Sequence, residues 1–263
     1  MHPILFSLGS FRLPTYGVLL VLALISGVVT ADRLGRREGF DPDRILDLTV
    51  WLIVTGVLGA KVLMVLTDWR YYWEYPRELL SASTLLAGGV FYGGFIAACL
   101  FGLWYIRVHR MPVGKVFDLY GPAVVVAQSI GRLGCFAAGC DYGRPTGSAL
   151  GVVFTNPLSH QLSGVPLGIR LYPTQILESL TTFLIFGILC WRYRHKTFDG
   201  QIFLLCMALY ATARFFLEFL RGDEDRGFVF GHLLSTSQLI ALVAIATVAG
   251  IALWQRRHLP KAS

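Results

Sequence analysis

The segment GRLGCFAAGCDYGRPT, residues 131–146, gathers arginines and cysteines within an otherwise apolar part of the chain. Gln128 lies four residues before Arg132, so on a helix the two side chains share one face. Gly131 leaves room beside that face. An arginine is always charged and presents a planar fork of N–H donors that suits a phosphate. We therefore expect this segment to line an anion-binding cavity; an arginine that only snorkels from a helix end is the alternative.

A second polar face lies in the segment YATARFFLEFLRGDEDRG, residues 210–227. Tyr210, Arg214 and Glu218 are spaced four residues apart, which places them on one side of a helix. Arg221 follows three residues later. The pattern favours a second set of donors for an anion, and a purely structural ion pair between Arg214 and Glu218 is the alternative interpretation.

Three other stretches place polar or glycine residues in apolar surroundings. Tyr16 lies at the start of the first apolar run, a position where tyrosine is also common as an interfacial anchor. The stretch AGGVFYGG, residues 87–94, sets Tyr92 among glycines, which allow close approach to another helix or to a ligand. Gln175 and Glu178 in YPTQILES add a further polar face. Because ionisable groups inside a bilayer are costly, their presence there indicates a functional site.

The two cysteines of the first segment, Cys135 and Cys140, form a C-x-x-x-x-C pair. This spacing matches neither the C-x-x-C redox motif nor half of a four-ligand zinc site, so no metal-ligand cluster is predicted. Three interpretations stay open: a disulfide, free thiols with a pKa lowered by Arg132, or simple space filling. The other cysteines lie in apolar runs and are expected to fill space there: Cys99, Cys190 and Cys206.

The elements that must position these residues are membrane-spanning helices. Of the 263 residues, 55% are hydrophobic and 15% are charged, with a mean hydropathy of +0.60, whereas a soluble domain has about 25% charged residues. Apolar runs near the roughly 20 residues needed to cross a bilayer recur along the chain. We predict an all-α polytopic membrane protein, a single transmembrane domain over residues 1–263, with these seven spans: 15–31, 47–66, 84–105, 117–135, 175–191, 200–219 and 233–254.

The net charge is +7, and the basic residues are distributed unevenly among the connections between the spans. More than half of the lysines and arginines fall in the connections after the first, third and fifth spans and in the C-terminal tail, which predicts an outer N-terminus and a cytoplasmic C-terminus. The remaining connections face outward, and residues 136–174 are expected to cap the site. The basic residues are dispersed over short turns, so no nucleic-acid partner is expected. Arginines in a cavity that opens outward inside a bilayer favour an anionic phospholipid as substrate.

The order of these motifs resembles a known family. Tyr16-Gly17, YGG at 92–94, Gln128, GRLG with a downstream Gly143, YPTQ with its glutamate, and the Y…RF…EF.R pattern follow one another as in prolipoprotein diacylglyceryl transferases. The family signature G-R-x-G-N-F-x-N-G-E-x-x-G is matched at these positions: Gly131, Arg132, Gly134, Phe136, Gly139 and Gly143.

The resemblance implies an activity. Such an enzyme moves the diacylglyceryl group of phosphatidylglycerol to the lipobox cysteine thiol of a preprolipoprotein at the outer face of the inner membrane. A thioether forms, glycerol phosphate leaves, and no cofactor or metal is needed. The resemblance implies catalytic roles for Arg132, Arg214 and Tyr92. It implies substrate-binding roles for Tyr16, Gly93, Gly94, Gln128, Gly131, Gly143, Gln175, Tyr210, Glu218 and Arg221.

The chain also departs from the family pattern. The histidine before the paired glycines is Tyr92 here, and another histidine is Tyr172, so the usual base for the acceptor thiol is absent. Cys135 and Cys140 stand where the family has asparagine and glutamate. Three alternatives therefore remain: a paralogue with another acceptor, a membrane thiol–disulfide protein using the two cysteines, and a phospholipid-binding protein without chemistry.

Overall fold

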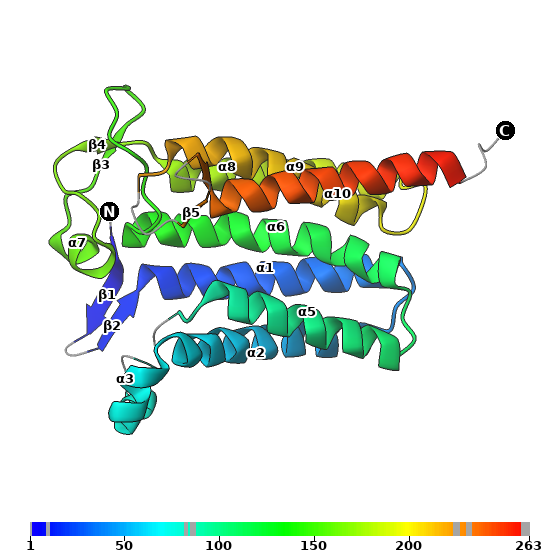
Figure 1. Ribbon diagram of the computed structural model, residues 1–263, viewed down its shortest axis with the longest axis horizontal. Helices are drawn as coiled ribbons and strands as arrows, with labels where there is room; N and C mark the ends of the chain where they lie inside the picture. The colour runs from blue at the N-terminus through cyan, green and yellow to red at the C-terminus, as the bar shows by residue number, and fades with distance from the viewer. Residues whose placement is uncertain are drawn as a thin grey trace. The chain divides into compact units, whose positions relative to one another are not determined.

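The computed structural model describes residues 2–8, 11–81, 84, 88–222, 227–229 and 233–258. The described chain is nearly all helical, and seven helices are long and apolar enough to cross a membrane. They confirm the predicted all-α class and the seven predicted spans (Figure 1). The seven are α1 (Thr15–Arg37), α2 (Pro42–Thr67), α5 (Phe91–Val108), α6 (Val113–Ala138), α8 (Thr174–Tyr193), α9 (Gln201–Leu217) and α10 (Thr236–His258).

The third span begins later than predicted. We expected it from residue 84, but α5 starts at Phe91. Gly89 precedes it with a φ of 75°, a left-handed conformation that a right-handed helix cannot contain. Part of the predicted stretch, residues 85–87, lies outside the described residues, as do residues 223–226 of the second polar segment.

Short elements connect the spans. An N-terminal hairpin pairs β1 (Ile4–Leu8) with β2 (Phe11–Pro14), and two further antiparallel pairs join β3 to β4 and β5 to β6. The remaining short elements are α3 (Trp69–Glu74), η1 (Pro76–Leu80), β3 (Val152–Val153), α7 (Pro157–Ser163), β4 (Arg170–Leu171), η2 (Glu218–Leu220), β5 (Phe228–Val229) and β6 (Leu234–Ser235).

The chain divides into two compact units, one formed by residues 1–30 and 117–263 and the other by residues 31–116. In the second unit α2 and α5 pack with their backbones in close contact. A Cβ atom on Gly94 would come within 2.6 Å of the Gly56 carbonyl oxygen, and one on Gly93 would overlap Gly59. Glycines at this crossing therefore let the two helices touch, which is the helix-packing interpretation of residues 87–94. A substrate contact by Gly93 and Gly94 stays a prediction.

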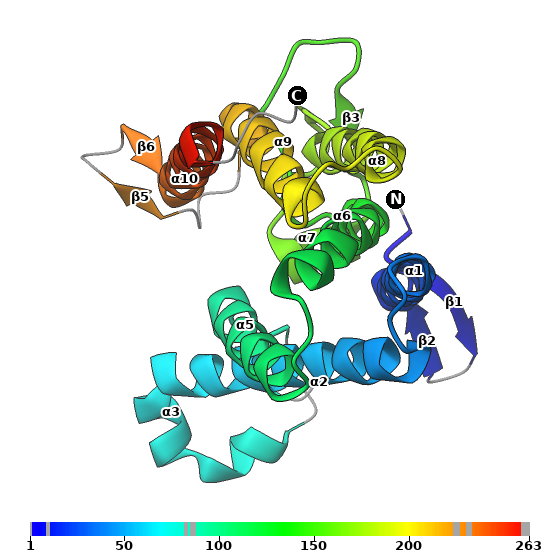
Figure 2. The same cartoon turned by 90° about the vertical axis from the view of Figure 1, so that its right-hand side faces the viewer.

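In the first unit α6, α8, α9 and α10 run side by side, and both views show it (Figures 1 and 2). A reciprocal pair of hydrogen bonds sets the register of α6 against α8. The Ser129 hydroxyl donates to the Ser179 carbonyl at 3.0 Å, and the Ser179 hydroxyl donates to the Ser129 carbonyl at 2.8 Å. Because both serines are buried, this pair holds their neighbours Gln128 and Glu178 at one level.

Asp118 of α6 caps the start of α9. Its fully buried carboxylate accepts hydrogen bonds from the backbone N–H groups of Gly200, Ile202 and Phe203 at 2.9, 2.8 and 3.1 Å. Lys196 adds an ion pair at 3.4 Å. The first N–H groups of a helix have no partner inside it, so a carboxylate on another helix satisfies them and joins the two helices.

We expect Asp118→Ala to lower the free energy of unfolding by roughly 3 kcal/mol, because it leaves buried N–H donors without their acceptor and removes one of the carboxylates that pair with Lys196. Asp118→Asn keeps one acceptor oxygen and should lose less. Thermal unfolding of the detergent-solubilised protein measures both changes. An alanine variant as stable as the unsubstituted chain would contradict this role of Asp118.

Residues 139–173 fold at one end of these helices, at the left of Figure 1. Phe154, Val165 and Leu171 are fully buried and form a small apolar core, against which Phe136 and Tyr142 pack. The segment lies within residues 136–174, over which the cap is expected, and α6 continues to Ala138. Its place outside the membrane stays a prediction.

Candidate active site

Three helices of the first unit meet at Glu178. Arg132 of α6 contacts one carboxylate oxygen through Nε at 3.1 Å, and Arg214 of α9 contacts the other through Nη1 at 3.4 Å. Glu178 itself lies in the first turns of α8 and is only 4% exposed. The two arginines singled out from the sequence therefore converge on one buried carboxylate.

Gln128 and Tyr210 belong to the same cluster. The Gln128 amide donates to Glu178 Oε1 at 2.9 Å and to the Tyr210 hydroxyl at 2.7 Å. The predicted shared face of Gln128 and Arg132 is thus the face of α6 that meets α8 and α9. One side-chain amide connects three helices around the arginines.

Glu218 pairs with Arg214 at 2.9 Å, which is the structural ion pair considered from the sequence. The same guanidinium also reaches Glu178 and, at 3.4 Å, the hydroxyl of Ser237 at the start of α10. Arg214 is therefore held by several helices at once. Its side chain keeps 15% of its surface exposed.

Asp141 joins Arg132, at the end of α6, to Arg221, which follows η2. Its Oδ2 accepts from Arg132 Nη1 at 2.9 Å, and its Oδ1 accepts from Arg221 Nη2 at 2.6 Å. Burial alone would raise the pKa of this carboxyl, but the guanidiniums of Arg132 and Arg221 outweigh that effect and hold the pKa below its ordinary value. Asp141 is therefore a carboxylate at neutral pH.

The loop that carries Asp141 is fixed by backbone contacts. Thr174 and Gln175, at the start of α8, donate from their side chains to the carbonyls of Asp141 and Cys140 at 2.8 and 2.7 Å. Gly143 pairs with Arg221 in an isolated β-bridge, and a Cβ atom there would overlap the Tyr172 carbonyl. Only glycine fits at 143, which accounts for its place in the motif.

Tyr16 lies next to this cluster on α1. A Cβ atom on Gly134 would lie 3.1 Å from a ring carbon of Tyr16, so Gly134 lets α1 approach α6. A Cβ atom at Gly131 would meet nothing within 4 Å, which agrees with the expected open space beside Arg132.

The site thus combines three arginines with three carboxylates. Asp141 was not selected from the sequence as a site residue, whereas Glu178 was placed with Gln175 on a polar face. Glu178 carried a usable signal, because an acid inside an apolar run is costly unless it is paired. Asp141 lies in a loop beyond the helix end, where no periodic pattern marks it.

Comparison with known proteins places the chain in a family. The sequence model of the family described as prolipoprotein diacylglyceryl transferase matches residues 3–254. The chain belongs to the prolipoprotein diacylglyceryl transferase family. It is 36% identical to the phosphatidylglycerol–prolipoprotein diacylglyceryl transferase of Clostridium tetani over 93% of this chain and 94% of that protein. It is 32% identical to the corresponding enzyme of Dehalococcoides mccartyi over 98% of this chain and 95% of that protein.

Together with its seven spans, this membership makes the chain a multi-pass membrane protein of the diacylglyceryl transferase family. Arg132 and Gly143, which the resemblance singled out, lie in the cluster described above. Tyr92, Gly93 and Gly94 belong to the other unit of this transferase. There Tyr92 is 47% exposed, and its catalytic role stays a prediction.

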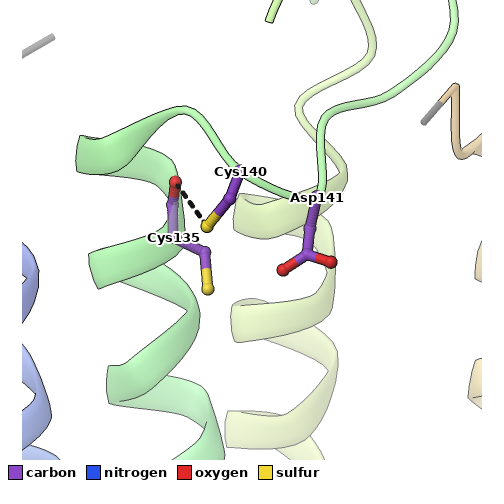
Figure 3. Close-up of side chains that lie close together, drawn as sticks. All are labelled: Cys135, Cys140 and Asp141. Atoms are coloured by element: carbon purple, nitrogen blue, oxygen red, sulfur yellow. Dashed lines mark hydrogen bonds between the residues drawn. The ribbon is translucent and has the colours of Figure 1, made fainter. Parts of the chain in front are cut away.

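The two cysteines of this family member are free thiols in the structure. Which of the three interpretations drawn from the sequence applies stays a prediction. The sulfur atoms of Cys135 and Cys140 and a carboxylate oxygen of Asp141 all lie within 4.8 Å of one another (Figure 3). From the sequence we expected no metal-ligand cluster. The fold brings the Asp141 carboxylate, a group that can bind a metal, beside the two thiols, and the spacing of the cysteines alone does not indicate it.

Proposed function

We propose that the chain transfers the diacylglyceryl group of phosphatidylglycerol to the lipobox cysteine of prolipoproteins at the outer face of the bacterial inner membrane. The observation that carries this proposal is family membership over residues 3–254, with Arg132 and Arg214 meeting at one carboxylate. The concentration of basic residues in the connections after the first, third and fifth spans favours a cytoplasmic position for them, and so supports an active site that opens outward.

The reaction places a growing negative charge beside the arginines. The acceptor thiol gives its proton to solvent, its sulfur attacks the glyceryl carbon, a C–S bond forms, and the C–O bond to the phosphate breaks. The electron pair leaves with the phosphate oxygen as glycerol phosphate. N–H donors that are already in position stabilise that charge without reorganising.

Arg132 has donors left for this task. Glu178 and Asp141 contact its Nε and Nη1, whereas a guanidinium carries five N–H donors. Its side chain keeps 18% of its surface exposed. The carboxylates therefore hold the guanidinium in place and leave part of it able to bind a phosphate.

Gln175 supports a role in recognising the head group. Its amide nitrogen donates a hydrogen bond to the Cys140 carbonyl, but its buried Oε1 has no hydrogen-bond partner among the described residues. An unsatisfied buried acceptor is costly. We assign it to a hydroxyl of the glycerol head group.

The experiment is reconstitution. Purified protein in vesicles of phosphatidylglycerol is mixed with a lipobox peptide, and mass spectrometry follows the diacylglyceryl thioether while released glycerol phosphate is quantified. We expect the two products in equal amounts, and none with a peptide whose cysteine is replaced by serine. Absence of a thioether with every lipobox peptide tested would overturn the proposal.

The same assay separates the alternatives. Phosphatidylglycerol that binds without any product would indicate a lipid-binding protein. A thioether on a different acceptor would indicate a paralogue with another substrate. Thiol–disulfide exchange that depends on Cys135 and Cys140, without lipidation, would indicate a redox protein.

A further inference from the structure

The thiols of Cys135 and Cys140 are brought together by the turn that ends α6. Gly139 has a φ of 91° and donates its N–H to the Cys135 carbonyl at 2.8 Å, so the chain reverses over the last helical turn. Cys140 then lies back against Cys135, with its sulfur 3.7 Å from the Cys135 carbonyl oxygen (Figure 3). Asp141 follows with a φ of 55°, and its carboxylate lies on the same side of the turn.

This environment is unusual for cysteines that only fill space. Both thiols are partly exposed, and their neighbours include the charged groups of Arg132 and Asp141. Two thiols and a carboxylate with no metal bound would repel one another if the thiols ionised. The same three groups form a donor set of the kind that binds a divalent cation.

We propose that Cys135, Cys140 and Asp141 form a binding site for one thiophilic divalent cation of the zinc type, with one coordination position left open. Thiolate sulfur and carboxylate oxygen are both common zinc ligands, and zinc sites with three protein ligands are typical of catalysis rather than of structure.

The dimensions agree with a small metal site. With zinc–sulfur bonds of about 2.3 Å at a tetrahedral angle, two ligating sulfurs lie about 3.8 Å apart. The three ligand atoms already lie within 4.8 Å of one another.

The groups around the three ligands hold them in place. Arg132 and Arg221 contact the two oxygens of Asp141, and each carboxylate oxygen has a second lone pair for a cation. Gln175 fixes the carbonyl of Cys140. Two thiolates, one carboxylate and a divalent cation sum to one negative charge; Arg132 and Arg221 add two positive charges, and Glu178, which pairs with Arg132, adds one negative charge, so the group is neutral. Hydrogen-bonded outer partners of this kind orient metal ligands and strengthen binding.

The open position gives the site a use in the reaction, and this part rests on the proposed transferase function. A cysteine thiol that binds a zinc-type cation loses its proton to solvent and becomes a thiolate. Such a thiolate of the lipobox cysteine could attack the glyceryl carbon as the C–O bond to phosphate breaks. The chain has Tyr92 where the family has a histidine, so activation by a metal would replace the missing base.

The experiment is a titration of purified, reduced and chelator-treated protein with Co²⁺, which reports thiolate ligands through charge-transfer absorbance. We expect one Co²⁺ per chain, displaced by Zn²⁺. Cys135→Ser and Cys140→Ser should each weaken binding by about 100-fold or more, since losing even an outer-shell partner costs about 10–100-fold. Asp141→Asn should also weaken binding. Cys99→Ser, an exposed cysteine of α5, is the matched control and should bind normally.

A lipobox cysteine peptide tests the open position. It should change the spectrum of the Co²⁺-bound protein, and its serine counterpart should not. No thiolate band in the reduced protein, or a band that survives in both cysteine variants, would overturn the site. So would protein isolated from cells with a disulfide between Cys135 and Cys140.

These outcomes separate the site from the proposed function. The metal titration needs neither lipid nor product. A protein that makes the thioether at full rate in excess chelator would retain the transferase proposal and overturn the metal's part in it. A protein that binds Co²⁺ through both cysteines but makes no thioether retains the site and overturns the transferase proposal.

Discussion

Replacing Arg132 with alanine is expected to lower the rate of diacylglyceryl transfer by about 10²–10³-fold, the loss typical of removing one preorganised donor from a developing anion. Arg132 links two of the three carboxylates of the site, since it contacts Glu178 and Asp141. Its loss removes the donors beside the phosphate and also the guanidinium that joins the Asp141 carboxylate to Glu178 of α8, although Thr174 and Gln175 still hold the backbone of this loop. The rate of thioether formation by purified protein in phosphatidylglycerol vesicles measures the effect.

Two further variants make the result specific. Arg132→Lys keeps the charge but loses the planar fork that holds two carboxylates, so we expect an intermediate rate. Arg192→Ala removes an arginine from the last turn of α8, about 20 Å along that helix from Glu178. It should transfer at the normal rate. If Arg132→Ala and Arg192→Ala behaved alike, Arg132 would have no part in the chemistry.

Replacing Glu178 with alanine should have the second large effect, on stability and on activity together. The change leaves Arg132, Arg214 and Gln128 without the acceptor that they share. Breaking a buried ion pair costs about 3–5 kcal/mol. We expect a value near the lower end, roughly 3 kcal/mol, because Arg132 keeps Asp141 and Arg214 keeps Glu218.

The activity should fall by roughly 100-fold, since a displacement of about 1 Å in a positioning group is enough for that loss. Glu178→Gln retains an acceptor oxygen and the side-chain volume, and should lie between alanine and the unsubstituted chain in both measurements. Thermal unfolding in detergent and the vesicle assay provide them. Glu74→Gln, on exposed α3, is the control. A Glu178→Ala protein as stable and as active as that control would contradict the proposed role.

The sequence was sufficient to predict the helices because bilayer-crossing runs need a length and an apolar composition that hydropathy measures directly. It also predicted which residues share a face, as for Gln128 with Arg132, since helical spacing decides that. It placed the start of the third span too early, because the left-handed turn at Gly89 interrupts a run that is apolar in composition alone.

The contacts between helices were beyond a single sequence. Nothing in the spacing of Glu178 relates it to Arg132, which lies 46 positions away; the packing of α8 on α6 does so. Asp141 was missed for a related reason. Its role depends on a loop conformation with a positive φ and on the partner Arg221 from a distant segment.

Helices α6 and α9 are joined at two levels. Asp118 binds the first N–H groups of α9, and ten residues later, about 15 Å along the axis, Gln128 donates to Tyr210. Two helices that are hydrogen-bonded to each other at two separate levels resist both tilting and sliding. A two-tailed lipid that entered between α6 and α9 would have to break one of these two sets of hydrogen bonds. We therefore expect it to enter between another pair of helices.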